Sequence, residues 1–169
     1  MAEENSNIKA FPGTGETGLG RNVPHNLPAE QNLLGAILLD NSVVERIDDR
    51  LIADHFYDPL HGRICATMLR MIERGQLANP VTLKSFFTDQ DNSIQDGTSA
   101  YLAELADGVI SITQAPDYAS IIYEAHIRRQ LILIGDQVIQ DASRLDVDVP
   151  AQKQIETVEA QLFRLAETD

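Results

Sequence analysis

Four residues whose side chains bind metals lie close together in the first half of the chain. They are His55, Asp58, His61 and Cys65. If a helix starts near Asp58, His61 and Cys65 share a face, because residues four apart in a helix project in the same direction. Zinc binds nitrogen and sulfur ligands of this kind, but a site needs at least three protein ligands in a suitable geometry. The pattern favours a structural alternative with a capping Asp58, a surface His61 and a buried Cys65, so we predict no metal site.

The stretch from Gly15 to Asn22 has the glycine spacing of a phosphate-binding loop. That motif ends in Lys followed by Ser or Thr, whereas Arg21 and Asn22 occupy those positions here. The loop also needs a strand before it and a helix directly after it, and neither pattern is present. We interpret the stretch as part of a flexible tail and predict no bound nucleotide or other cofactor.

Two acidic pairs, Asp48 with Asp49 and Asp146 with Asp148, are the candidates for acid-base chemistry. Such chemistry requires burial or a close partner that moves one pKa away from the other. Both pairs lie beside segments that resemble exposed turns, which favours solvated surface charge. A serine nucleophile motif and a dinucleotide fingerprint are absent. We therefore predict that this chain is not an enzyme by itself and has no catalytic residue.

The charge of the chain argues against direct binding of nucleic acid. Its 169 residues include 26 acidic and 13 basic side chains, which gives a formal charge of −13. Most of such a surface repels phosphate backbones, so a basic protein is the more natural partner. No apolar run approaches the ~20 residues of a membrane span, and the single Cys65 excludes an internal disulfide. We predict a soluble intracellular domain with no membrane contact.

Helix signals dominate residues 27–114, which we predict to form a compact head. Leu27 to Glu30 is typical of a helix start, since proline suits the first position and an acidic residue suits the first turn. Further helix starts are indicated at Ser42, at Asp58-Pro59, at Thr82 and at Thr98 or Ser99. Gly75 and Gly108 are typical of helix ends. Apart from Val109 to Thr113, no segment has the alternation of a strand, so we predict an all-α fold with about five short head helices. Residues 1–26 are predicted to be a disordered tail rich in Gly and Pro.

Residues 115–169 are predicted to form a long antiparallel helical hairpin, the arm. The longest segment without proline, Asp117 to Leu145, is apolar on two sides. One stripe consists of Ile127, Leu131, Ile134, Val138 and Leu145. A second group lies roughly a third to a half of a turn away and consists of Tyr118, Ile121, Ile122, Ala125, Ile132, Ile139 and Ala142. The closing segment Ala151 to Ala166 carries a stripe of Ile155, Val158, Leu162 and Leu165 and should fold back on the long helix.

Each apolar side of the long helix needs its own partner. We expect one side to pack on the closing helix and the other on the arm of a second copy of the chain. The second group is the candidate subunit interface, although the sequence leaves open which side has which partner. Arg128 and Arg129, the densest positive charge in the arm, are expected to pair with acids such as Glu124 or Asp136.

Six blocks of the sequence, in the same order, resemble the N-terminal domain of the DnaB family of bacterial replicative DNA helicases. The first block resembles the family pattern EAEQ-x-x-LG-x-x-LDN in Glu30-Gln31, Leu34-Gly35 and Leu39-Asp40-Asn41. The next blocks are Asp54 to Tyr57 with His61 and Ile64, Pro80 to Leu83, and Ala100 to Leu105. The last two are Tyr118-Ala119 with Arg129 and Leu131-Ile132, and Glu159 with Leu162-Phe163 and Ala166-Glu167. The resemblance covers residues 27–168.

The resemblance implies a non-catalytic assembly domain. In such helicases the arms pair across subunits, the dimers form a three-fold collar on the hexamer, and the heads receive the helicase-binding domain of primase. A helicase loader is a further partner that the resemblance suggests, and the implied location is the cytoplasm, with the replication machinery at the nucleoid. ATP and Mg²⁺, and contact with DNA, belong to the family's RecA-like motor domain, which is absent from this chain.

The sequence departs from the family pattern at two places in the head. Val43-Val44 stands where many members have tryptophan, which concerns core packing, and Asp107 to Ala115 lacks the usual Thr-Pro-Ser, which leaves the connection of head to arm open. The alternative functions are a stand-alone helical adaptor that binds and regulates the helicase, and a small metalloenzyme built on His55, His61 and Cys65.

Overall fold

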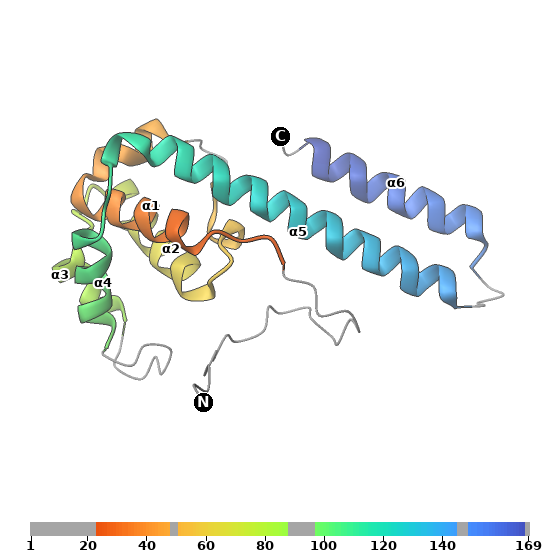
Figure 1. The fold of residues 1–169 in the computed structure, drawn as a ribbon, viewed down its shortest axis with the longest axis horizontal. Helices are drawn as coiled ribbons and strands as arrows, with labels where there is room; N and C mark the ends of the chain where they lie inside the picture. The colour runs from red at the N-terminus through yellow and green to blue at the C-terminus, as the bar shows by residue number, and fades with distance from the viewer. Residues whose placement is uncertain (1–22, 48–50, 88–96, 145–148, 168–169) are drawn as a thin grey trace, which may run out of the picture.

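The protein consists of a helical head and a two-helix arm (Figure 1). Our computed structural model describes residues 23–47, 51–87, 97–144 and 149–167. Within these ranges every regular element is a helix and there is no strand, so the predicted all-α fold is confirmed. None of the described helices combines the length and the apolar character that crossing a bilayer requires.

The helices differ greatly in length between the head and the arm. In chain order they are α1 (Leu27–Leu39), the 3-10 helices η1 (Asn41–Arg46) and η2 (Ala53–His55), α2 (Pro59–Glu73), α3 (Pro80–Leu83), η3 (Lys84–Phe86), α4 (Thr98–Asp107), η4 (Ile112–Gln114), α5 (Ala115–Ser143) and α6 (Ala151–Glu167). The segment Val109 to Thr113 contains the start of η4 and no strand.

Polar side chains fix where the first head helices begin. The side chains of Asn26, Asp58 and Asn79 accept hydrogen bonds from backbone N–H groups in the first turns of α1, α2 and α3. Each of these helices has proline in its first turn, where the missing N–H would have no partner within the helix. The predicted starts of α1 and α2 are confirmed, and Gly75, with a φ of 70°, follows the end of α2 as predicted.

Three predicted caps are wrong, and each true cap lies slightly earlier in the chain. Asp40 caps η1 by accepting from the N–H of Ser42 at 3.0 Å. Asn79 caps α3, while the hydroxyl of Thr82 accepts from the N–H of Asn79 at 3.0 Å and completes a capping box. At α4 the cap position is taken by Gly97, and no side chain caps the helix.

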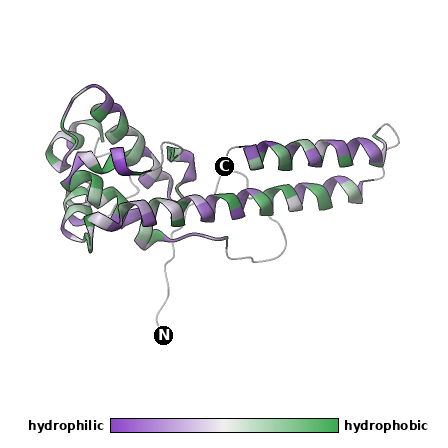
Figure 2. Cartoon of the chain, turned by 90° about the horizontal axis from the view of Figure 1, so that it is seen from above, coloured by the Kyte–Doolittle hydropathy of each residue, from purple (hydrophilic) through white to green (hydrophobic). Residues whose placement is uncertain are grey.

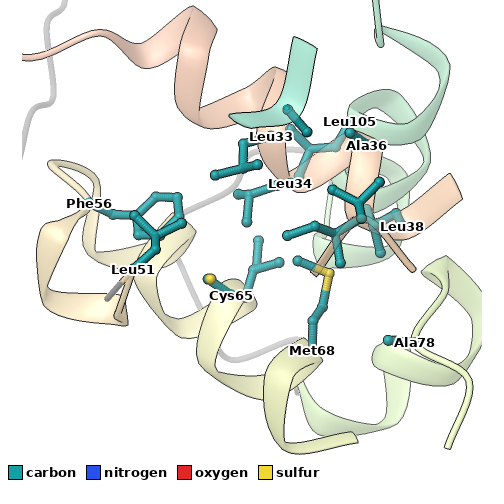
Figure 3. Packing of buried hydrophobic residues seen from close by; sticks show 14 of the residues in the cluster. Leu33, Leu34, Ala36, Leu38, Leu51, Phe56, Cys65, Met68, Ala78 and Leu105 are labelled. Carbon is teal, nitrogen blue, oxygen red and sulfur yellow. The ribbon is translucent and has the colours of Figure 1, made fainter. Parts of the chain in front are cut away.

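Helix α1 lies at the centre of the head. Leu33, Leu34, Ala36 and Ile37 have no exposed surface, because α2, α4 and α5 all pack against this helix. Figure 3 shows the leucines of α1 above Cys65 of α2 and its neighbours in the core. Full burial of one such leucine contributes roughly 1.5–3 kcal/mol. The core is therefore built around α1.

Close packing of α1 on α4 depends on Gly35. A Cβ atom at this position would overlap the carbonyl oxygen of Leu105 and lie 2.5 Å from a methyl carbon of Val109. Only glycine allows the two backbones to approach this closely. The Leu34-Gly35 pair of the first sequence block therefore has a packing role.

Helix α5 joins the head to the arm. Its first two turns belong to the head, since Ala115, Ala119 and Ile122 are buried in the core. Contacts with the head continue as far as Arg129, beyond which α5 projects from the head, and α6 returns antiparallel beside α5 (Figure 1). Near the tip of this hairpin, Nε2 of Gln154 donates to the carbonyl oxygen of Asp141 at 3.1 Å.

The four described residues before α1 lie against the head. The ring of His25 stacks on Tyr57 with 4.2 Å between ring centroids, and the carbonyl oxygen of Pro24 accepts a hydrogen bond from Arg129. These residues had been assigned to the disordered tail, so the tail prediction extended too far at its C-terminal end. Residues 1–22, which include the phosphate-loop-like stretch, lie outside the described residues, as do both acidic pairs considered above.

Candidate functional site

His61, predicted to be a surface residue, is buried in a hydrogen-bonded chain of three side chains. It is 1% exposed, and its Nδ1 lies 2.6 Å from Oε2 of Glu30, which is also 1% exposed. Its Nε2 lies 2.5 Å from the hydroxyl of Tyr101. The same carboxylate accepts from the backbone N–H of Tyr57 at 2.6 Å and from that of Asp58 at 3.3 Å. The chain links α1, α2 and α4 and satisfies these buried polar groups.

The geometry of the hydrogen bonds among Glu30, His61 and Tyr101 indicates a structural role. Both ring nitrogens of His61 have partners, so neither is available to bind a metal in this arrangement. Burial raises the pKa of Tyr101, which keeps its hydroxyl protonated. Burial also raises the pKa of the Cys65 thiol to about 12, which disfavours the thiolate that zinc requires. Among the described residues, no three His, Cys, Asp or Glu side chains gather as a metal site would require.

Arg129 ties the arm to the head. Its guanidinium donates to the carbonyl oxygen of Pro24 at 2.9 Å and to that of His55 at 2.6 Å, and it lies over the ring of Tyr57. The side chain is 1% exposed. Burial lowers its pKa, and the charge of Glu30 opposes that effect. The burial of Arg129 was not predicted from the sequence, although Arg129 and Tyr57 both belong to the sequence blocks that resemble the DnaB family.

The neighbouring Arg128 has the role that the sequence predicted. It lies on the exposed side of α5 and pairs with Glu124 one turn earlier, with 2.8 Å between Nη2 and Oε1. Two adjacent arginines thus differ completely in environment, because they lie about 100° apart around the helix.

Two histidines pack together beside Arg129. The rings of His55 in η2 and His126 in α5 have centroids 4.4 Å apart. The pKa of His126 is lowered to about 4, mainly by burial and then by the charges of His55 and Arg129. Burial also lowers the pKa of His55. Both imidazoles are therefore neutral near pH 7, which lets them pack against a guanidinium.

The seven predicted interface residues differ in exposure in the structure. Ile122 is 1% exposed in the head core, and Tyr118 is partly buried against that core. Ala125 and Ile132 are partly buried. Ile121, Ile139 and Ala142 are exposed, the first two by 42% and 58%. Which of these seven residues contact a second copy stays a prediction.

The other stripe of α5 faces α6 only in part. Ile127, Ile134 and Val138 are partly covered, whereas Leu131 is 47% exposed and Leu145 lies outside the described residues. On α6, Val158 and Leu165 are partly covered, but Ile155 and Leu162 are exposed by 52% and 42%. Phe163 beside them is 63% exposed. Each helix therefore keeps apolar residues that its hairpin partner does not cover.

These uncovered residues share one side of the hairpin, here called the outer face of the arm. It consists of Ile121, Leu131, Ile139, Ile155, Leu162 and Phe163. On each helix they are rotated from the residues facing the other helix in the same sense, by about 40° for Leu131 and up to about 150° for Phe163. Because α5 and α6 are antiparallel, rotations in the same sense bring both sets to the same side of the hairpin. Figure 2 shows hydrophobic residues recurring along both arm helices.

The chain is similar in sequence to replicative DNA helicases. Residues 22–124 match the family model described as the DnaB-like helicase N terminal domain. The replicative DNA helicase DnaB of Rickettsia felis is 40% identical over 147 residues, which are 86% of this chain and 30% of that protein. The DnaB of Rickettsia typhi is 37% identical over 164 residues, or 96% of this chain and 33% of that protein. The chain thus spans about a third of the length of these relatives.

Solved structures agree with the sequence comparison. The N-terminal domain of DnaB helicase from Mycobacterium tuberculosis has a TM-score of 0.72 and 27% identity, covering 85% of this chain and 99% of that one. A DnaB-like replicative helicase, whose structure was described with its interactions with primase, has a TM-score of 0.64 and 25% identity. It covers 83% of this chain and 31% of that one. The resemblance inferred from the six sequence blocks is confirmed, and the match is to the non-catalytic N-terminal domain of DnaB: the chain belongs to the DnaB-like helicase N-terminal domain family.

Proposed function

We propose that this chain is an assembly domain that pairs with a second copy of itself through the outer face of the arm. The observation that carries the proposal is the set of six large apolar side chains on one side of the hairpin, each at least 42% exposed. Large exposed apolar side chains gathered on one side of a hairpin are unfavourable in water and typically mark an interaction site. If the arms of two copies pack about a two-fold axis, the outer face of each copy is covered by the outer face of the other.

Within a replicative helicase, we propose that such pairs form a three-fold collar on the hexamer. The collar would hold the motor domains at high effective concentration. ATP, Mg²⁺ and DNA would then be bound by the motor domain of the longer protein, and this chain would bind no cofactor. This division of roles is supported by the chain's match to about a third of each relative and by its formal charge of −13, which disfavours contact with a phosphate backbone.

The heads are proposed to receive the helicase-binding domain of primase, with a helicase loader as a further partner. The structure of a similar helicase described with its interactions with primase supports the first partner. A strongly acidic surface suits protein docking, because charge complementarity speeds encounter with a basic partner. The corresponding location is the cytoplasm, at the replication machinery.

Analytical ultracentrifugation of the chain tests the pairing. We expect concentration-dependent dimers for the natural sequence and monomers for Ile139→Asp and Leu162→Asp, because each buries a carboxylate in the proposed interface. Val81→Asp is the matched control, since Val81 is an exposed apolar residue on the head, 81% accessible. A chain that stays monomeric at all accessible concentrations, or dimers that survive both outer-face substitutions, would refute the proposal.

A further inference from the structure

A notch lies between the head and the end of α6, with α5 as its floor. Its volume is about 900 Å³, and it is open to solvent on one side. Most of its surface is apolar, with Ile127 and Ile134 of α5 and Leu165 of α6 in the lining. Ile52 at its wall is 50% exposed. None of the six residues of the outer face lines the notch, so it is separate from the proposed pairing surface.

The described part of the chain begins beside this notch. The ring of His25 stacks on Tyr57, which lines the notch, with 4.2 Å between ring centroids. The carbonyl oxygen of Pro24 accepts from Arg129, whose guanidinium also donates to the carbonyl oxygen of His55, another lining residue. These contacts fix the point from which the N-terminal sequence starts, close to the lining.

The N-terminal sequence contains one short apolar cluster of a size that fits the notch. Ile8 and Phe11 lie three residues apart. The other large apolar residues in 1–22, Met1 and Leu19, stand alone. One turn of helix with a diameter of about 10 Å occupies about 500 Å³, which is within the volume of the notch. Both apolar side chains would leave water if they were placed against the apolar lining.

The connection from this cluster to the head is long enough to reach the notch. It consists of residues 12–22 and includes Gly13, Gly15, Gly18 and Gly20. A chain of this length spans up to about 40 Å, whereas the notch floor from Ile127 to Ile134 extends about 10 Å. A glycine-rich connection of this length holds its end at an effective concentration of about 1 mM. A segment that binds only weakly as a free peptide is therefore able to occupy the notch of its own chain.

We propose that residues 8–11 of the same chain, here called the plug, dock in the notch. Ile8 and Phe11 rest on the apolar lining. Lys9, the one charge in residues 5–12, is opposite in sign to the formal charge of −13 of the chain, so electrostatic repulsion does not oppose docking. Any partner that uses the notch must first displace the plug. A second copy of the chain and a separate partner protein are the competing occupants.

Tryptophan fluorescence tests the proposal, because the natural chain contains no tryptophan. Phe11→Trp places one in the plug, and Leu19→Trp places one in the connection as the matched control. Quenching by acrylamide measures how far each tryptophan is protected from solvent. If the intrinsic Kd is about 0.1 mM, an effective concentration of about 1 mM keeps the plug docked in about nine molecules of ten. Quenching in the Phe11→Trp chain should therefore be several-fold weaker than in the Leu19→Trp chain.

Two further substitutions, made in the Phe11→Trp chain, remove the docking from either side. Ile52→Asp puts a carboxylate in the wall of the notch, and Ile8→Asp puts one in the plug without changing the head. Each should raise quenching to the level of the Leu19→Trp chain. Ile110→Asp is the matched control, since Ile110 is 81% exposed on the head and does not line the notch. Circular dichroism should show the same helix content in all of these chains.

The dependence of quenching on protein concentration distinguishes the proposed occupant from a second copy. A plug held in the notch of its own chain is equally protected at every concentration. Protection that increases with concentration would place the plug in a second copy and overturn the proposal. Equal quenching of Phe11→Trp and Leu19→Trp would leave the notch to a separate partner and also overturn it. Protection that survives both Ile52→Asp and Ile8→Asp would show that the plug binds elsewhere.

Discussion

Glu30 and His61 form a buried pair with 2.6 Å between Oε2 and Nδ1, and each residue is 1% exposed. The two residues come from different sequence blocks of the family pattern and from different helices. The carboxylate also accepts two backbone N–H groups at the start of α2. One side chain thus fixes both the position of α2 and the orientation of its histidine.

Replacing Glu30 should therefore destabilise the whole head. The carboxylate of Glu30 meets the backbone N–H groups of Tyr57 and Asp58 and the ring of His61. Glu30→Gln replaces one carboxylate oxygen by an NH₂ group, which cannot accept a hydrogen bond, so a buried polar group loses its partner. The free energy of unfolding should fall by at least about 2 kcal/mol. Urea unfolding followed by circular dichroism measures this change. Glu124→Gln is the matched control, because it breaks an exposed pair with Arg128 and should cost less than about 0.5 kcal/mol. Equal effects of the two substitutions would contradict the role of Glu30.

Two helical glycines should respond oppositely to alanine. Gly35→Ala brings a methyl group into the carbonyl oxygen of Leu105, so α1 and α4 must separate, at a cost of about 1–3 kcal/mol. Gly135→Ala meets no atom within 4 Å in the middle of α5 and should stabilise by about 0.5–1 kcal/mol. Thermal unfolding in the monomeric Leu162→Asp background measures both. A stabilising Gly35→Ala would show that this close approach is not needed.

The helices of the head could be predicted because their start signals are local. Proline in the first turn marks the starts of α1 and α2 where the sequence predicts them, whereas the predicted cap Thr82 lies three residues after the true cap of α3, Asn79. The burial of His61 could not be predicted in this way, since its partners Glu30 and Tyr101 lie 31 and 40 residues away in the sequence. The single available signal was their presence in the family pattern, which indicates importance without stating a contact.

The arm shows a second limit of sequence reasoning. A stripe such as Ile155, Val158, Leu162 and Leu165 spans about 80° of a helix, whereas a single neighbouring helix covers a narrower part. Val158 and Leu165 turn toward α5, and Ile155 and Leu162 turn away. Periodicity identifies the apolar side, but the angle at which two helices pack decides which half of it remains exposed.

Arg129 should control how firmly the segment before α1 is held. Arg129→Met keeps much of the apolar stem but removes the donors to the carbonyl oxygens of Pro24 and His55. We expect a loss of about 2–3 kcal/mol, because buried carbonyl groups lose a charged donor. Hydrogen exchange should show faster exchange in residues 23–26 and in η2, with the α6 amides unaffected. Arg128→Met, on the exposed side of α5, is the control and should change neither measurement.

The paired histidines predict that stability falls on acidification. In the folded chain the pKa of His126 is about 4, and that of His55 is also lowered, while an unfolded histidine titrates near 6.5. Between these values the unfolded chain binds more protons than the folded chain, so stability rises with pH. The contribution of the two neutral histidines to the free energy of unfolding is fully present above about pH 6.5. It is lost as the pH falls toward 4, by at most about 1.4 kcal/mol per pH unit for each histidine. The charges of His55 and Arg129 oppose protonation of His126, and that of Asp54 favours it.

Unfolding in urea at a series of pH values tests this dependence. His126→Gln removes one of the two groups and should flatten the slope between about pH 4 and 6.5 relative to the natural chain. His25→Gln is the control, because that ring is exposed beside Tyr57 and does not belong to the pair. An unchanged slope in His126→Gln would show that other groups set the acid limit of stability. A flattened slope, with the control unchanged, would locate the acid-sensitive contact where η2 meets α5, the same place at which Arg129 connects the arm to the head.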